Sequence, residues 1–307
     1  QDIQLACREA KANMIIFDND LSPVQVNNLD LAVGIKVIDR TEVILQIFAR
    51  RARSAEAQIQ VELAQLQYLV SRLPVSAKQS RFKGGIGMKG PGESPLQLRN
   101  EPMRRRIRDL KVKLESIQQR RERTRQRQKW PLVSLVGYTN AGKSTLLNAF
   151  AAADAYVDDR LFATLDTKTR LVHLPDGSDI LMADTVGFIR HLPHGLVASF
   201  QSTLDVATDA DLLLIVTDAG HPRVGDHLQV VEETLKEIHA DSVPSLLLLN
   251  KSDTPGARLN LPALTERYPA AVAISATQGD GLDRVKDLIS GRLRDAVHRR
   301  DTHRESQ

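Results

Sequence analysis

Cysteine is almost absent from this chain of 307 residues, since Cys7 is the only one. A single thiol excludes disulfide bonds within the chain and zinc sites built from several cysteines. Lack of internal disulfides is typical of a reducing compartment, so we expect a cytoplasmic protein. We interpret Cys7 itself as a buried or idle thiol.

Long apolar runs are also missing. No uninterrupted apolar stretch approaches the ~20 residues that a membrane-spanning helix needs, and the first residues lack the pattern of a secretion signal. We therefore expect a soluble protein without a membrane partner. The first residue is Gln1 rather than Met, and residues 3–10 already have a helical pattern, so we expect the numbering to begin partway into a domain.

Positive charge is concentrated in one segment. Residues 99–129 contain 13 Lys and Arg against 4 Asp and Glu, a local excess of +9. Because the formal net charge of the chain is +4, the remaining residues sum to −5. A basic segment on an otherwise acidic protein is suited to binding a phosphate backbone. The alternative interpretation is a solvated helix face.

Two domains are expected from the length and from the 42% hydrophobic content. Residues 14–23 have the pattern of a short strand and a turn, and a helix pattern then begins at Ser22 and Pro23 and ends at Gly34. A second strand pattern covers residues 35–39. The sequence therefore predicts a small α/β unit over residues 1–40.

Two long helical patterns follow, the first beginning near Thr41. Apolar residues recur in both at steps of three and four, which places them on one face of each helix. These residues are Ile59, Leu63, Leu66, Val70 and Leu73 in the first helix, and Ile107, Leu110, Leu114 and Ile117 in the second. We predict an antiparallel helical hairpin over residues 41–129, with the basic segment on its second helix.

The two helices are joined by a glycine-rich segment. Residues 83–95 contain five glycines and two prolines, which excludes regular secondary structure. A flexible linker is one interpretation. A thin, positively charged loop at the tip of the hairpin is the other, because Lys83, Ile86, Met88 and Lys89 are unlike a Gly/Ser spacer.

Strand and helix patterns alternate after Trp130 and Pro131. Several of the strand patterns are continuously apolar, which is typical of a parallel sheet covered on both faces. The sequence therefore predicts an α/β domain with a mostly parallel sheet over residues 130–298, followed by a tail over 299–307. Ligands of such domains bind at the carboxyl ends of the strands.

The stretch GYTNAGKS, residues 137–144, fits the phosphate-binding loop motif and lies between a predicted strand and a predicted helix. In this motif the backbone N–H groups and the positive end of the helix surround phosphates. We expect Lys143 to neutralise the outer phosphates and Ser144 to ligate Mg²⁺.

Three more motifs follow at the ends of predicted strands. In ADTVG, Asp184 is expected to hold the water shell of the metal, and the Gly187 amide to meet the γ-phosphate. In LLLLNKSD, the Asp253 carboxylate can accept two hydrogen bonds from guanine, whereas adenine offers no such donors, so GTP is favoured over ATP. The ISAT stretch then supplies a backbone and small side chains beside the base.

These motifs, in this order, resemble the P-loop GTPases of the translation-factor-like class over roughly residues 129–297. The resemblance implies that Thr164 is the switch residue that reaches Mg²⁺, with Thr169 as a competing candidate. Asp166 or Thr167 could be structural caps. Residues 186–194 would form the second switch.

Asn140 matches the position that helps to bind a potassium ion in several related GTPases. A loop asparagine that bonds only to the backbone is the alternative. The predicted cofactors are therefore Mg²⁺ and, as an option left open, K⁺, with GTP as substrate and GDP as product.

The resulting site has three groups of residues. The catalytic group is Lys143, Thr164 and Gly187, and the metal ligands are Ser144, Thr164 and Asp184. The nucleotide-binding group consists of Gly137, Tyr138, Thr139, Asn140, Ala141, Gly142, Lys143, Ser144, Thr145, Asp184, Gly187, Asn250, Lys251, Asp253, Ser275 and Ala276.

Phe188 occupies the position after Gly187, where many such GTPases have a glutamine that orients the attacking water. A phenylalanine ring has neither a donor nor an acceptor. We therefore predict slow intrinsic hydrolysis that a bound partner, a potassium ion or a switch rearrangement completes. The alternative is that Phe188 serves only in packing.

Six stretches together closely resemble the HflX family of ribosome-associated GTPases across almost the whole chain. They are FDNDLSPVQ, DRTEVILQIFARRA, GIGMKGPGE, VGYTNAGKSTLLN, LFATLDTKTR and DTVGFIRHLPHGLVASFQSTL. The resemblance implies a GTPase domain that the ribosome activates and a glycine-rich tip that reaches toward the catalytic centre of the large subunit. We expect a monomer whose partners are the large ribosomal subunit and its ribosomal RNA.

Members of this family are implicated in splitting stalled or idle ribosomes. A nucleotide-gated RNA-binding module that separates no subunits is the alternative. The chain departs from the family after GPGE, where SPLQLRNEPM replaces the usual polar continuation, so the helix is expected to start only after some additional residues.

Overall fold

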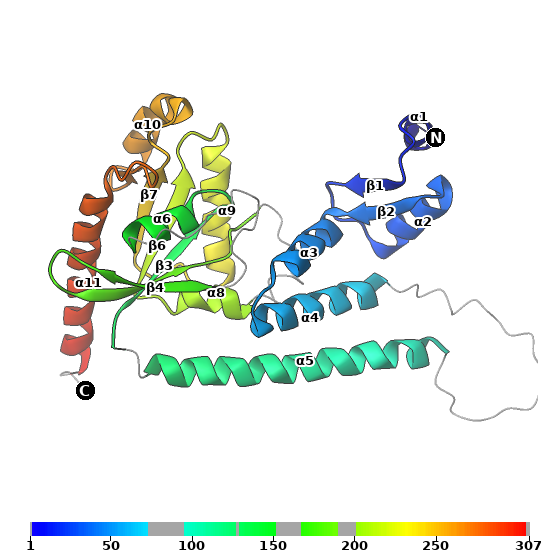
Figure 1. Ribbon diagram of the computed structural model, residues 1–307, viewed down its shortest axis with the longest axis horizontal. Coiled ribbons are helices and arrows are strands. Elements are labelled where there is room, and N and C mark those ends of the chain that lie inside the picture. Colours follow the sequence, from blue (N-terminus) through cyan, green and yellow to red (C-terminus); the bar gives the residue numbers. More distant parts are fainter. Residues whose placement is uncertain (1, 73–94, 127–128, 152–166, 190–200, 305–307) are drawn as a thin grey trace, which may run out of the picture. The chain divides into compact units, whose positions relative to one another are not determined.

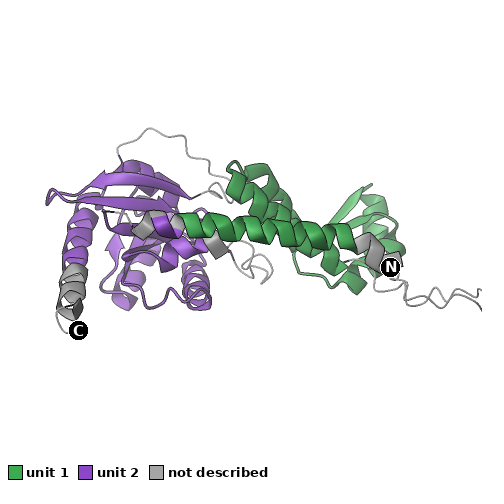
Figure 2. Ribbon diagram, turned by 90° about the horizontal axis from the view of Figure 1, so that it is seen from below, with its two compact units in different colours: residues 1–120 green, residues 121–307 purple. Residues whose placement is uncertain are grey.

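The computed structural model describes residues 2–72, 95–126, 129–151, 167–189 and 201–304. The chain forms two compact units, residues 1–120 and residues 121–307 (Figure 2). The division falls within one long helix, whereas the sequence predicted a boundary at residue 129. None of the helices in the described ranges is both long and apolar enough to cross a membrane.

The first unit begins with a small α/β arrangement (Figure 1). Its elements are α1 (Asp2–Glu9), β1 (Met14–Phe17), α2 (Pro23–Val33) and β2 (Lys36–Asp39). The two strands pair in parallel, with Met14 opposite Lys36. Ser22 caps α2 in a capping box with Gln25, and Gly34 ends the helix in the left-handed conformation with φ 75°.

Three helices complete this unit: α3 (Arg40–Arg51), α4 (Ala55–Arg72) and α5 (Pro95–Gln126). The single long helix predicted from Thr41 is therefore wrong, because the chain breaks between α3 and α4. The break has a local cause, since the Ser54 hydroxyl accepts a hydrogen bond of 3.0 Å from the Ala57 N–H and so starts a new helix.

The helical hairpin consists of α4 and α5, which run side by side in Figure 1. Arg106 of α5 donates two hydrogen bonds, of 2.7 and 2.8 Å, to the carboxylate of Glu62 on α4. Leu110 of α5 is 0% exposed, as its place on the predicted apolar face implies. The helix α5 begins at Pro95 and continues through Pro102, so the additional residues expected before it are already helical.

The apolar face predicted for α4 is only partly the buried one. Leu63 is buried, but Ile59, Leu66 and Val70 are half-buried, and Leu73 lies outside the described residues. The buried residues of α4 are Ala57, Gln60, Val61, Leu63 and Ala64. The buried face of α4 differs from the predicted stripe, and α4 packs against α3 as well as α5.

A buried carboxylate joins the end of α4 to β2. Asp39 accepts hydrogen bonds from the Tyr68 hydroxyl at 2.7 Å and from the Glu42 N–H at 2.9 Å, and it forms an ion pair with Arg72. The Arg72 guanidinium also lies 4.2 Å from the centre of the Tyr68 ring. Burial, followed by the bond to Asp39, raises the pKa of Tyr68 well above its ordinary value.

The second unit is an α/β domain built on one sheet. The strands are β3 (Leu132–Gly137), β4 (Lys168–His173), β5 (Asp179–Asp184), β6 (Leu212–Asp218), β7 (Ser245–Asn250) and β8 (Val272–Ala273). Their order is β4-β5-β3-β6-β7-β8, and only β4 is antiparallel to its neighbour. The mostly parallel sheet predicted from the apolar strands is therefore confirmed.

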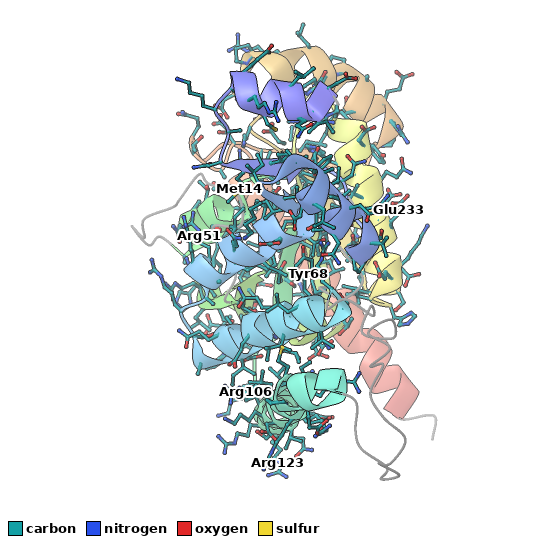
Figure 3. The ribbon with its side chains drawn as sticks, turned by 90° about the vertical axis from the view of Figure 1, so that its right-hand side faces the viewer. Met14, Arg51, Tyr68, Arg106, Arg123 and Glu233 are labelled. Carbon is teal, nitrogen blue, oxygen red and sulfur yellow. The ribbon has the colours of Figure 1, made fainter. Side chains whose placement is uncertain are left out.

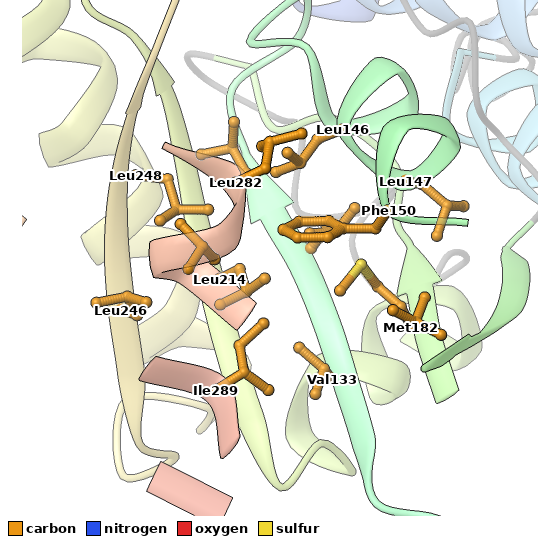
Figure 4. Packing of buried hydrophobic residues seen from close by; sticks show 14 of the residues in the cluster. Val133, Leu146, Leu147, Phe150, Met182, Leu214, Leu246, Leu248, Leu282 and Ile289 are labelled. Atoms are coloured by element: carbon orange, nitrogen blue, oxygen red, sulfur yellow. The ribbon is translucent and has the colours of Figure 1, made fainter. Parts of the chain in front are cut away.

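Helices cover both faces of this sheet. They are α6 (Lys143–Phe150), α8 (Gln201–Thr208), α9 (Val224–Glu237), α10 (Pro255–Arg267) and α11 (Leu282–Arg304). On one face Leu146, Phe150 and Ile289 from α6 and α11 pack on strand residues such as Val133 and Leu214 (Figure 4). Residues of α8 and α9 form a second cluster with Val136 and Leu213. The carboxyl ends of β3, β5 and β7 carry the motifs of the candidate site.

Candidate nucleotide-binding site

Residues 137–142 connect β3 to α6, as the phosphate-binding loop motif requires. A Cβ atom on Gly137 would lie 2.1 Å from the Val216 carbonyl oxygen, and one on Gly142 would lie 2.3 Å from Nδ2 of Asn250. Gly142 also has φ 94°. Both glycines are therefore needed for the close approach of the loop to β6 and β7. Asn140 is exposed and also has a positive φ, of 61°.

Lys143, the first residue of α6, is held inside this loop. Its side chain is 6% exposed, and its ammonium group donates hydrogen bonds of 3.0 Å to the carbonyl oxygens of Gly137 and Tyr138. Burial lowers the pKa of Lys143 to about 8, against the opposing effect of the nearby Asp184 carboxylate. The site thus contains a buried cation whose protonation responds to added negative charge.

Ser144 and Asp184 meet at the ends of α6 and β5. The Ser144 hydroxyl donates a hydrogen bond of 2.6 Å to Oδ2 of Asp184, and the Asp184 side chain is fully buried. A hydroxyl and a carboxylate are the oxygen ligands that Mg²⁺ prefers. No group of three or more His, Cys, Asp and Glu side chains among the described residues could hold a metal. The pair therefore fits an ion that takes its other ligands from phosphate and water.

The segment after β5 lies directly on the phosphate-binding loop. The Thr139 N–H donates to the Phe188 carbonyl at 2.9 Å, and the Phe188 N–H donates to the Gly137 carbonyl at 3.0 Å. A Cβ atom on Gly187 would lie 2.8 Å from Cα of Thr139 and 3.0 Å from Nζ of Lys143. Position 187 therefore has room only for glycine.

Phe188 turns its side chain into the domain core. The ring is 3% exposed and belongs to the apolar cluster that includes Val136, Leu204 and Leu213. In this conformation the ring packs beneath the loop and presents no polar atom to a water molecule. The ring therefore has a packing role in the structure, and the slow hydrolysis expected from position 188 stays a prediction.

The two motifs at the ends of β7 and β8 are tied to each other and to the phosphate-binding loop. Asn250 is 1% exposed, and its amide donates to the Ala141 carbonyl at 2.8 Å and accepts from the Ala276 N–H at 3.1 Å. The exposed Asp253 carboxylate accepts a hydrogen bond of 2.6 Å from the buried Ser275 hydroxyl. Asn250 therefore holds three loops in register, and Ser275 fixes the direction of the Asp253 carboxylate.

Lys251 has a partner that the sequence reasoning did not identify. Its ammonium group forms an ion pair of 2.8 Å with Asp218 at the end of β6, and its backbone has φ 61°. Asp218 is the last residue of the apolar stretch LLLIVTD. A carboxylate at the end of a predicted strand is a sequence signal that could have identified Asp218 as part of the site. Asp218 also accepts a hydrogen bond of 2.9 Å from the Gly220 N–H.

The structure does not describe every predicted residue. Thr164 and Asp166 lie outside the described residues, and so does the part of the second switch after Ile189. Thr167 lies just before β4, and Thr169 is exposed on β4 opposite Ala183. Thr145 lies in the first turn of α6 and is half-buried. The remaining site residues gather around the ends of β3, β5 and β7 and the loop after β8.

This combination of sheet, phosphate-binding loop and guanine-type motifs defines a P-loop GTPase. Family models match three successive parts of the chain: "GTP-binding GTPase N-terminal" over residues 1–49, "GTP-binding GTPase Middle Region" over 51–128, and "50S ribosome-binding GTPase" over 132–251.

Curated relatives named GTPase HflX match nearly the whole chain. The protein from Caldanaerobacter subterraneus is 44% identical over 95% of this chain and 68% of its own length. That from Escherichia coli K12 is 43% identical over 95% and 70%, and that from Alkalihalophilus pseudofirmus is 48% identical over 82% and 61%. This chain therefore belongs to the HflX family of GTPases, enzymes that hydrolyse GTP, and it spans between about three fifths and seven tenths of the length of these relatives.

Solved structures agree with this assignment. A GTP-binding protein from the archaeon Sulfolobus solfataricus in complex with GDP is 26% identical, with a TM-score of 0.52 over 96% of this chain and 85% of its own. A GDP complex of SsGBP is 27% identical, with a TM-score of 0.55 over the same shares. The resemblance to the HflX family that the sequence predicted is confirmed.

Proposed function

We propose that this protein is a GTPase that hydrolyses GTP slowly by itself and faster when bound to the large ribosomal subunit. The observation that carries the proposal is that two sets of polar groups lie at the carboxyl ends of strands of one sheet. Lys143, Ser144 and Asp184 would bind the phosphates, and Asp253, which is bonded to Ser275, would bind the base.

Guanine is the base that suits the second set. A carboxylate at position 253 can accept from both N1–H and the exocyclic amine of guanine, and adenine would leave it without a donor. The Ser275 hydroxyl already holds this carboxylate at 2.6 Å, so little reorientation is needed when the base binds. Asn250 supports the same loops from below through its bonds to Ala141 and Ala276.

The phosphates would bind over the amides of residues 137–144. Lys143 would exchange its two loop carbonyls for phosphate oxygens, and the Gly187 amide would donate to the γ-phosphate. Ser144 and Asp184 would hold Mg²⁺, with Thr164 joining them. An Mg²⁺ ion held by these residues would supply positive charge that neutralises the phosphates.

Slow intrinsic hydrolysis is expected because position 188 has no side chain that can form a hydrogen bond to the attacking water. The Phe188 ring is buried and offers no hydrogen bond, so the attacking water has no side chain from this position to orient it. A partner, a potassium ion near Asn140 or a rearrangement of residues 186–194 would complete the step. If a partner orients the attacking water, GTP hydrolysis depends on binding of that partner.

The large ribosomal subunit is the partner that the basic helix suits. The Lys and Arg side chains of α5 whose surroundings are described are all exposed, and Arg106 and Arg123 are labelled along this helix in Figure 3. The match to a model of 50S ribosome-binding GTPases points the same way. We further propose that the protein acts as a monomer in the cytoplasm and separates stalled or idle ribosomes into subunits.

Turnover of GTP with and without purified large subunits tests this proposal. We expect phosphate release to be slow for the chain alone and to rise at least tenfold with large subunits, while small subunits have no comparable effect. Turnover that ignores added subunits, or that is already rapid without them, would overturn it.

Subunit separation needs its own experiment, because exposed basic charge on α5 also suits a module that only binds RNA. Sedimentation of 70S ribosomes with the chain and GTP, and with a non-hydrolysable analogue, distinguishes the two. Loss of 70S particles supports splitting, and co-migration of the chain with intact ribosomes supports the RNA-binding alternative.

A further inference from the structure

Three aromatic rings form a continuous stack beside the phosphate-binding loop. The rings of Tyr138 and His227 are nearly parallel, with centres 3.8 Å apart and an angle of 5° between their planes. The rings of His227 and His221 follow at 4.1 Å and 35°. Tyr138 belongs to the loop, His227 to α9, and His221 to the segment that follows β6.

The backbone of Tyr138 is a junction of the site. Its carbonyl accepts the 3.0 Å hydrogen bond from Lys143, and its backbone forms a parallel bridge with Phe188 at the start of the second switch. The position of the Tyr138 ring therefore affects the orientation of the first peptide group of the phosphate-binding loop. Any group that holds this ring also affects the geometry in which the loop meets phosphate.

The other end of the stack is fixed to the base side of the site. The Arg223 N–H donates a hydrogen bond of 3.0 Å to Nδ1 of His221. Asn260 of α10 donates to the carbonyls of Ala219, at 2.9 Å, and of His221, at 3.3 Å. The same segment begins with Asp218, which pairs with Lys251.

His227 is uncharged in this environment. Burial lowers its pKa to about 4, and the neighbouring His221 and Arg223 act in the same direction, whereas Asp218 and Asp226 oppose them. At neutral pH a neutral imidazole thus lies flat against the phenol ring. Such contacts between flat rings contribute beyond the area that they bury.

We propose that His227 is a positioning residue for nucleotide binding, because its ring holds Tyr138 and links the phosphate-binding loop to the segment that orients Lys251. The proposal rests on the proposed GTP site and adds a residue of α9 that touches no nucleotide itself. The alternative explanation is that the His227 side chain only fills space and does not order the loop.

Two substitutions separate these explanations. His227→Phe keeps a flat ring, whereas His227→Leu replaces the imidazole with an apolar side chain of moderate size and removes the stack. We expect GDP to dissociate from the Leu variant roughly two- to tenfold faster, in line with the strength of aromatic pairs. The Phe variant should stay within about twofold of the unsubstituted chain.

The measurement is stopped-flow release of a fluorescent GDP from the full chain, with excess unlabelled GDP. Gln229→Ala is the matched control, since Gln229 is exposed on α9 and bonds only to Glu233 in the described structure. Thermal melting of each variant shows whether it is folded. A double-mutant cycle with Tyr138→Leu keeps the test informative if one variant is destabilised, because it measures the coupling of the two rings.

Equal release rates for His227→Leu and the unsubstituted chain would overturn the inference, and so would equally fast release from the Phe and Leu variants. A cycle without coupling between positions 138 and 227 would also contradict it. No ribosome enters this assay. If the unsubstituted chain binds GDP but the Leu variant behaves normally, the inference fails and the proposed GTPase function stands.

Discussion

Lys143 shows how one buried side chain can couple nucleotide binding to pH. In the free protein its pKa is about 8, lowered by burial. Bound phosphates add negative charge and raise this pKa again. As the pH approaches and exceeds 8, Lys143 is less protonated in the free protein than in the complex. Nucleotide binding therefore takes up protons, and the affinity for nucleotide falls as the pH rises.

We expect GDP binding to take up about 0.1 proton through Lys143 at pH 7 and about 0.8 at pH 8.5, from a pKa of about 8. Calorimetry in two buffers with different ionisation enthalpies measures this uptake. Lys143→Arg is the control, since a guanidinium stays charged at both pH values. Uptake that does not change between pH 7 and pH 8.5 would show that Lys143 is not the coupled group.

At the scale of elements, two of the ion pairs on the helices of the first unit lie in different environments. Arg72 on α4 pairs with Asp39, which is fully buried and also bonded to Tyr68. Arg106 on α5 pairs with Glu62, and both side chains are more than two fifths exposed. Removal of one partner therefore leaves a buried charge in the first case and a hydrated one in the second.

The two arginines give a matched pair of variants. Arg72→Met should lower the free energy of unfolding by roughly 3–5 kcal/mol, because Asp39 remains buried without its counter-charge. Arg106→Met should lower it by less than about 1 kcal/mol. Urea unfolding followed by circular dichroism measures both. Similar losses in the two variants would contradict the assigned burial.

The sequence predicted the strands of the second unit better than the boundaries of the helices in the first unit. Strands such as β6 and β7 were found because each is a nearly continuous apolar run, and the order of the motifs at the strand ends followed. The antiparallel strand β4, with the sequence KTRLVH, has no such run and was not predicted. The α3–α4 break was missed because the helical pattern continues across it. The chain turns extended at Ala52, and the bond between Ser54 and Ala57 marks where α4 begins. The buried face of α4 was also misplaced, and α4 packs against α3 as well as α5.

For the whole molecule, the basic helix α5 predicts how binding to RNA depends on salt. Each phosphate that a Lys or Arg neutralises releases counterions, so affinity falls with ionic strength in proportion to the number of contacts. Arg104, Arg105 and Arg108 are exposed on one stretch of α5. Reversal of their charges should remove several contacts at once.

We expect the triple variant with Glu at positions 104, 105 and 108 to bind ribosomal RNA more weakly and to reduce the slope of log affinity against log salt by roughly two to three units. Filter binding over a range of salt concentrations measures the slope. A control with Glu at Arg258, Arg267 and Arg284, which are exposed on α10 and α11, changes the net charge equally. If both triple variants change the slope alike, α5 has no special role.

The sequence alone determined the class of this protein, because its chemistry depends on residue types at fixed short spacings. Lys143 and Ser144 follow a glycine loop, Asp184 and Gly187 follow an apolar strand, and Asp253 follows another. Parallel strands bring their carboxyl ends to one edge, so these motifs had to meet there. The match to the HflX family confirmed that reading.

Only the tertiary structure decided how these motifs are supported. The burial of the Phe188 ring, the pairing of Asp218 with Lys251 and the stack of Tyr138 on His227 all join residues from different elements. No local spacing encodes such contacts, because they depend on the way that strands and helices pack. A residue pattern can name the groups that meet a nucleotide, whereas packing determines what holds those groups in place.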